Sequence, residues 1–153
     1  MPDVFISYSS KDGDLARQLR DEMAEHGIDA FLAEISIEAG AKWKDSIIDA
    51  LTQSKWVFFL ATPAACASNA VMHEIGGALF GKKELITVLC GLAPRELPAW
   101  VQDRQAIDLR KREEVLSTIQ KVAEVVRSDK FVAGLVAGGL LAFGIWALAS
   151  GKK

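Results

Sequence analysis

The stretch that decides the fold is KWVFFLA at residues 55–61, which is apolar almost throughout. A run of this kind is typical of a central strand that other elements cover on both faces. Four further runs have strand character, at residues 4–8, 29–32, 84–89 and 105–109. We therefore expect five strands, with residues 55–61 in a central position.

Stretches with helical periodicity separate these strands, and this alternation is typical of a doubly wound parallel sheet. In such sheets ligands bind at the carboxyl ends of the strands. Here that edge comprises the loops after Tyr8, Leu32 and Ala61. We expect helices at residues 12–26, 43–53, 69–80 and 111–127.

The sequence predicts the end of one of these helices and the buried side chains of another. Gly27 ends the helix at residues 12–26, because glycine readily takes the backbone conformation that follows a helix. In the helix at residues 43–53, Ile47, Ile48 and Leu51 are expected to turn inward.

Charge is distributed unevenly along the chain. Of 153 residues, 25% are charged and 50% are hydrophobic. All 20 acidic residues and all but two of the 18 basic ones precede residue 131. The domain is therefore mildly acidic and has no basic stripe to follow a phosphate backbone, so we do not expect nucleic acid as a partner.

The two cysteines, Cys66 and Cys90, stand in apolar or small-residue surroundings without CxxC spacing or a nearby histidine pair. We expect reduced, buried thiols and no metal site. The first ten residues, MPDVFISYSS, lack the basic and apolar regions of a secretory signal. The domain is therefore expected in the cytoplasm.

Residues 131–150, FVAGLVAGGLLAFGIWALAS, carry no charge. A helix of roughly 20 residues reaches across the ~30 Å hydrocarbon core of a bilayer. Trp146, Lys130 and the two terminal lysines are expected interfacial anchors. We therefore predict a transmembrane helix, the alternative being a core helix of a larger assembly.

The flanks of this segment predict its orientation and its packing. Five basic residues precede the segment between residues 111 and 130 and two follow it, which favours a cytoplasmic domain and a single-pass C-terminal anchor in the inner membrane. Gly134 and Gly138 are four residues apart, a spacing that lets two helices approach closely in lipid. Self-association through this face is one expectation, although small residues are common in single spans.

Four segments, taken in order, resemble the TIR (Toll/interleukin-1 receptor) family over residues 3–110. They are DVFISYSS at 3–10, EAG at 38–40 followed by Trp43, SKWVFFLATP at 54–63 and HEIGGAL at 73–79. The last looks most like the prokaryotic, NAD+-cleaving branch. The resemblance implies a flavodoxin-like, five-stranded parallel sheet flanked by helices, with residues 1–110 as the TIR core. We expect residues 111–130 to form the last helix and the juxtamembrane connection, residues 131–150 the transmembrane helix predicted above, and residues 151–153 a short tail.

TIR domains comprise scaffolds that signal by assembly and enzymes that cleave NAD+ with one glutamate in the helix after the third strand. By position that glutamate is Glu74, which without the resemblance would be read as a solvated helix residue. One carboxylate suffices because nicotinamide is a pyridinium cation that departs neutral, whereas ordinary glycosidases need two carboxylates. Glu74 would stabilise an oxocarbenium-like ribose. NAD+ is then the substrate, with no cofactor, and the product is ADP-ribose or a cyclic isomer.

The resemblance also implies substrate contacts in the first loop. Tyr8, Ser9, Ser10 and Lys11 match the segment that contacts the nucleotide in enzymatic relatives. Lys11 would pair with a phosphate and the serines would donate hydrogen bonds. The alternative is a plain turn that caps the next helix through Ser10 or Asp12.

Further substrate contacts are implied by the second loop and the helix with Glu74. Glu38 lies in the loop after the second strand, where relatives carry a functional glutamate, and Gly40 of the same loop is also expected to contact the substrate. Trp43 either stacks on an aromatic ring of NAD+ or packs against the sheet. Ala70 departs from the pattern, because many enzymatic members have an aromatic residue four positions before the glutamate, and its absence here puts one stacking wall in doubt.

These observations favour a membrane-anchored NAD+ glycohydrolase, an NAD+ nucleosidase acting as a bacterial antiphage or cell-suicide effector that becomes active when its TIR domains assemble. Its partners would be NAD+, the lipid bilayer and further copies of itself. A non-catalytic adaptor that recruits partners to a membrane is the main alternative. A third possibility is that the tail damages the membrane and the TIR domain acts as its switch.

Overall fold

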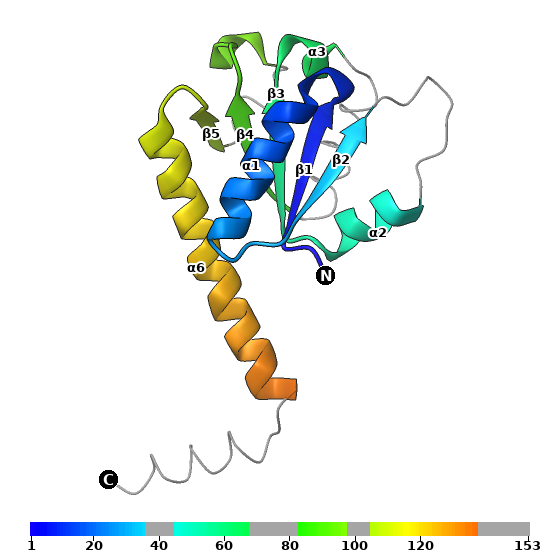
Figure 1. Cartoon of the computed structure of the whole chain (residues 1–153), viewed down its shortest axis with the longest axis vertical. Helices are drawn as coiled ribbons and strands as arrows, with labels where there is room; N and C mark the ends of the chain where they lie inside the picture. The colour runs from blue at the N-terminus through cyan, green and yellow to red at the C-terminus, as the bar shows by residue number, and fades with distance from the viewer. Residues whose placement is uncertain (36–44, 68–82, 98–104, 138–153) are drawn as a thin grey trace, which may run out of the picture.

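A computed structural model describes residues 1–35, 45–67, 83–97 and 105–137 (Figure 1). Five parallel strands form one sheet in the order β2-β1-β3-β4-β5. The predicted five-stranded parallel sheet flanked by helices is thereby confirmed. The strands are β1 (Val4–Ser9), β2 (Ala30–Ile35), β3 (Trp56–Ala61), β4 (Glu84–Leu89) and β5 (Gln105–Asp108), and the helices are η1 (Ser10–Asp12), α1 (Gly13–Glu25), α2 (Asp45–Gln53), α3 (Pro63–Cys66), η2 (Pro94–Glu96) and α6 (Arg112–Ala137).

Strand β3 is the middle strand, and its residues Val57 to Ala61 are completely buried. Its alternate side chains belong to two different cores, with Phe58 on one face and Phe59 on the other. Burying each large apolar side chain contributes about 1.5–3 kcal/mol. The prediction that KWVFFLA forms a central, doubly covered strand is confirmed.

Helices α1 and α6 pack on one face of the sheet, and α2 and α3 contribute to the core on the other (Figure 1). Because side chains alternate along a strand, Ile6 and Tyr8 of β1 face α1 and α6, while Phe5 faces α2. Phe5 stacks on Phe31 of β2 with ring centroids 5.9 Å apart.

The prediction that Ile48 turns inward is wrong, because its exposed fraction is 46%. Ile47 and Leu51 pack against the core as expected, and Ala50 between them is buried. Residues 47, 50 and 51 share a face at helical spacing, whereas Ile48 lies about 100° away from Ile47. Gly27 follows α1 with φ +79°, which confirms it as the residue that ends this helix.

Helix α3 was not anticipated from the sequence, although its start carries a clear signal. Thr62 caps the helix, since its hydroxyl accepts a hydrogen bond of 3.0 Å from the Ala65 amide, and Pro63 occupies the first turn. A threonine followed by proline is a favoured helix start. The expected helix start at Ser68 or Asn69 lies outside the described residues.

Helix α6 was expected to end at Arg127 but continues unbroken to Ala137. Its first half packs on the sheet through Val115, Ile119 and Val126, whereas Phe131 is 68% exposed. Within the part of the chain that the structure describes, no helix is long and apolar enough to cross a membrane. Residues 138–150 of the predicted span, including Gly138, lie outside that part.

A matched pair of isoleucines tests this packing. Ile119→Ala removes a completely buried side chain from the face of α6 that packs on the sheet. We expect it to lower the free energy of unfolding by about 2–5 kcal/mol. Ile48→Ala, at an exposed position, should change it by less than about 0.5 kcal/mol. Urea unfolding of the two full-length variants measures both values, and equal losses would contradict the assigned burial.

Candidate functional site

Because all five strands are parallel, their carboxyl ends meet at one edge of the sheet, the upper edge in Figure 1. The described residues at this edge are the η1 turn after β1, Thr62 and α3 after β3, Cys90 after β4 and the turn after β5. We call this the carboxyl edge. It contains three of the residues that sequence reasoning assigned to substrate binding, namely Ser9, Ser10 and Lys11.

The loop after β1 is a short 3-10 turn that Ser9 caps. The Ser9 hydroxyl accepts a hydrogen bond of 3.4 Å from the backbone N–H of Lys11. Ser9 is buried, and the side chains of Ser10 and Lys11 are exposed. Ser9 therefore caps the 3-10 turn, and the turn presents Lys11 to solvent. The expected alternative, a helix cap through Ser10 or Asp12, is not formed at Asp12, whose side chain makes no capping hydrogen bond to α1.

Asp12 and Thr62 join two loops of the carboxyl edge. The Thr62 hydroxyl donates a hydrogen bond of 2.6 Å to Oδ2 of Asp12 and accepts one from the Ala65 amide. Sequence reasoning named Asp12 only as a possible helix cap and did not name Thr62. The Thr62-Pro63 helix start was a recognisable signal for the threonine, but the pairing joins positions far apart in the chain and no local pattern indicates it.

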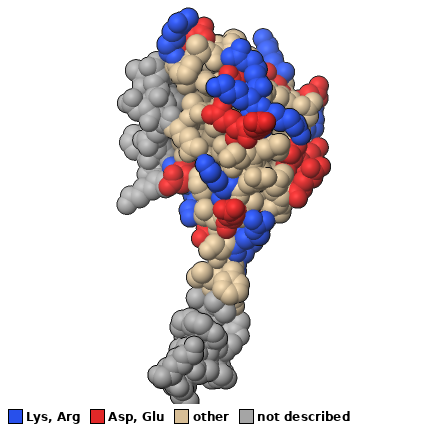
Figure 2. Space-filling view, turned by 90° about the vertical axis from the view of Figure 1, so that its left-hand side faces the viewer, with Lys and Arg blue, Asp and Glu red and all other residues tan. Residues whose placement is uncertain are grey.

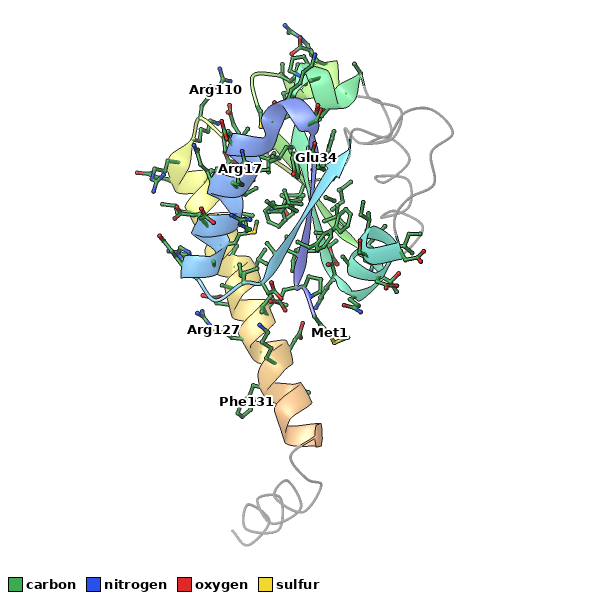
Figure 3. All side chains as sticks on the ribbon, turned by 45° about the vertical axis from the view of Figure 1, so that its right-hand side comes forward. Met1, Arg17, Glu34, Arg110, Arg127 and Phe131 are labelled. Carbon is green, nitrogen blue, oxygen red and sulfur yellow. The ribbon has the colours of Figure 1, made fainter. Side chains whose placement is uncertain are left out.

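Tyr8, another predicted substrate contact, lies in the core next to α1 with 5% of its surface exposed. Burial raises the pKa of its phenol, and the Glu34 carboxylate on the neighbouring strand raises this pKa further. The positive charges of Arg17 and Arg20 lower the pKa of Tyr8 by a smaller amount. Figure 3 shows Glu34 and Arg17 in the upper half of the molecule. Tyr8 is therefore a neutral, packed phenol, and its contact with substrate stays a prediction.

Cys66 and Cys90 are free thiols, as expected, but both are half-buried rather than fully buried. Burial raises the pKa of Cys66. Burial raises the pKa of Cys90 to about 12, with smaller contributions from the carboxylates of Asp12 and Asp108. Both thiols therefore stay protonated at neutral pH and are poor nucleophiles.

The turn after β5 holds a closed ion pair that sequence reasoning did not single out. The Asp108 carboxylate accepts hydrogen bonds from the backbone N–H of Arg110 at 3.0 Å and from its Nε and Nη2 at 3.1 and 2.9 Å. These hydrogen bonds lower the pKa of Asp108 to about 2. Arg110 is therefore paired within its own turn, whereas Lys11 of the η1 turn has an exposed side chain.

Of the remaining predicted site residues, all but Gly134 lie outside the described ranges. Among the described residues, no group of three His, Cys, Asp or Glu side chains is placed to hold a metal ion. Gly134 is described and lies exposed in the last turn of α6. The residues left undescribed are Glu38, Gly40, Trp43, Ala70, Glu74 and Gly138.

The fold and the carboxyl edge define a class: a parallel α/β domain whose loops can bind a ligand at one edge of the sheet. The sequence matches the family described as "TIR domain" over residues 4–123. The chain therefore belongs to the TIR domain family. No curated protein matches the sequence.

Solved TIR structures share this fold. The TIR domain of the Toll-related receptor TRR-2 from Hydra magnipapillata is 17% identical with a TM-score of 0.64, over 80% of this chain and 98% of that one. The TIR-STING receptor from C. gigas in complex with 2',3'-cGAMP is 25% identical with a TM-score of 0.60, over 78% of this chain and 40% of that one. The RPS4 and RRS1 TIR heterodimer is 14% identical with a TM-score of 0.53, over 84% and 97%.

Alkylation tests the state of Cys90. A thiol with a pKa near 12 instead of 9 has about a thousandfold less thiolate at pH 8, so Cys90 should react with iodoacetamide at least that much more slowly in the folded chain than in denaturant. The rate should rise with pH up to about 12. Peptide mass spectrometry measures the rate at each cysteine, and equal rates at Cys90 in the folded and unfolded chains would contradict the assignment.

Proposed function

We propose that this protein is an NAD+ glycohydrolase that breaks the bond between nicotinamide and ribose. The observation that carries the proposal is TIR family membership over residues 4–123 together with a carboxyl edge at which the β1 turn and the β3 loop are joined. The exposed Lys11 would pair with the pyrophosphate of NAD+. Glu74 follows α3 in the sequence and would supply the carboxylate.

The chemistry needs few groups because the leaving group carries the positive charge. When the bond between C1′ of the ribose and the pyridinium nitrogen breaks, the electron pair goes to that nitrogen and nicotinamide leaves neutral. The positive charge then develops on the ribose, where the Glu74 carboxylate would stabilise it. Water attacking C1′ releases a proton and gives ADP-ribose, and attack by an adenine nitrogen of the same molecule gives a cyclic isomer.

Glu74→Gln tests this role, because it keeps the size of the side chain and removes its charge. We expect nicotinamide release to fall by about 10²–10³-fold. Glu25→Gln, an exposed glutamate at the last turn of α1, is the matched control and should leave release unchanged. Chromatography of NAD+ incubated with the full-length protein in bilayers measures the rate. If densely clustered wild-type protein released no nicotinamide, the proposed enzymatic function would be wrong.

A second candidate function is a non-catalytic adaptor, because similar TIR domains assemble with one another. RPS4 and RRS1 TIR domains form a heterodimer, and Roq1 TIR domains belong to an activated resistosome. Self-association of this chain is therefore part of both candidates. An adaptor would keep its biological effect when Glu74 is replaced and assembly is retained, and an enzyme would lose it.

We also propose that residues 131–150 anchor the protein in the inner membrane of a bacterial cell, with the domain in the cytoplasm. Support comes from α6, which runs from the sheet into this segment as one helix. Asp129 pairs with Lys55 at 3.2 Å and Lys130 with Asp3 at 3.1 Å, so the helix is held at the amino ends of β3 and β1.

The proposed anchor would then lie at the opposite end of the domain from the proposed substrate site. Met1, Arg127 and Phe131 lie at the lower end, and Arg17, Glu34 and Arg110 lie in the upper half (Figure 3). A six-residue strand spans about 20 Å between the two edges. Figure 2 shows charges of both signs interspersed over the face with α6, which suits a domain that stands in water.

Self-assembly on the membrane would provide the trigger. Tethering raises the effective concentration of the domains, which favours contacts between neighbours. Gly134 has open space around it, since a Cβ there would meet nothing within 4 Å. A second helix could therefore approach this face through Gly134 and Gly138. As an effector of antiphage defence or cell suicide, such a protein would stay silent until its domains gather.

Charges placed in the segment test the anchor. Leu140→Arg combined with Leu141→Arg adds about 2.5–3.5 kcal/mol per residue to the cost of insertion, so the protein should move from the carbonate-washed membrane pellet to the supernatant. Ile48→Arg, at an exposed position of the domain, should stay in the pellet like the wild type. If the double variant stays in the pellet after the same wash, the proposal that residues 131–150 anchor the protein is wrong.

A further inference from the structure

The hydrogen bond between Asp12 and Thr62 links positions that are 50 residues apart in the sequence. Asp12 closes the η1 turn after β1, and Thr62 starts α3 after β3. We propose that this hydrogen bond couples the two loops into one unit, with Asp12 and Thr62 as positioning residues of the carboxyl edge. The part of the proposal that concerns catalysis depends on the NAD+ glycohydrolase function.

The orientation of the Thr62 hydroxyl makes the contact directional. Thr62 Oγ1 lies 2.6 Å from Asp12 Oδ2 and donates its one hydrogen to it, while the same oxygen accepts from the Ala65 amide at 3.0 Å. Thr62 is 7% exposed, and the hydrogen bond is partly buried. A hydrogen bond to an ionised carboxylate is stronger than one between neutral groups. Because this one is partly buried, water and salt screen it less than they would at an exposed position. The contact is therefore strong enough to hold the loops together.

Asp12 makes this contact instead of the one its position suggests. It stands at the N-cap of α1, where an aspartate ordinarily accepts a hydrogen bond from the first turn of its own helix. Its side chain makes no capping hydrogen bond. The carboxylate is thus directed to another loop, and the local stabilisation that a cap would contribute to α1 is given up for a contact between loops.

The link has a direct consequence for the two segments assigned to the substrate. On one side, the Ser9 cap fixes the turn that presents Lys11. On the other, the Thr62 cap fixes α3, and the chain that follows α3 contains Glu74. A nucleotide that binds the Lys11 turn would therefore also act on α3 through the hydrogen bond between Asp12 and Thr62, and α3 precedes Glu74 in the sequence.

Hydrogen exchange of the full-length protein, reconstituted in bilayers, tests the coupling through its cross-effects. Asp12→Ala should speed exchange at residues 62–67 about tenfold, and Thr62→Val should do the same at residues 9–13, because each variant removes the hydrogen bond that joins the two loops. Thr62→Ser and Asp12→Asn, which keep a donor and an acceptor, should restore protection.

Thr118→Val is the matched control. Thr118 is also 7% exposed, and its hydroxyl donates to the Glu114 carbonyl at 2.9 Å within α6. Its loss should leave exchange in both loops unchanged. The coupling is overturned if Asp12→Ala speeds exchange only near residue 12 and Thr62→Val only near residue 62, or if Thr118→Val has the same effect on both loops.

Nicotinamide release gives the second readout. Asp12→Ala and Thr62→Val should each lower kcat/KM for NAD+ about tenfold, while Thr62→Ser and Thr118→Val keep the wild-type value. Wild-type kcat/KM in both Asp12→Ala and Thr62→Val would overturn the positioning role. If the wild type releases no nicotinamide, the glycohydrolase proposal fails, and the exchange experiment still decides whether the loops are coupled.

Discussion

Burial of both faces of β3 is the constraint on which the rest of the structure depends. Residues 57–61 of this strand are all buried. Their backbone groups therefore need hydrogen-bond partners on neighbouring strands at both sides, and their side chains need helices that cover both faces of the sheet. Parallel neighbours require crossover connections, and the helices that form these connections supply the two covering layers. Phe58 and Phe59 thus anchor opposite cores through one stretch of chain.

The same parallel arrangement gives the domain two structurally different ends. All carboxyl ends of the strands meet at one edge, where the loops are free to vary and to bind a ligand. At the other edge α6 leaves the domain, held by Asp129 and Lys130 against residues that precede β3 and β1. These ion pairs are exposed and weak individually, so the packing of Val126 and the residues before it fixes the helix more than the charges do.

How far the sequence predicted this molecule follows from the range of each interaction. Periodicity and burial are local patterns, and they predicted the five strands, with Glu84–Leu89 matched at both ends. Ile48 was misplaced because a hydrophobic residue beside an inward face was assumed to belong to it. At the candidate site, the resemblance indicated the Ser9 to Lys11 turn, but the link from Asp12 to Thr62 joins residues that only the folded sheet brings together.

The proposed reaction would rely on one carboxylate, so it would depend on the geometry of the site rather than on the number of catalytic groups. With a neutral leaving group there is no proton to deliver, so the rate depends on how closely the negative charge approaches the ribose as its positive charge develops. A displacement of about 1 Å weakens such an interaction substantially. Loops that follow different strands move independently unless something joins them. A partly buried, charge-assisted hydrogen bond between the β1 and β3 loops provides that connection without adding a further group to the site.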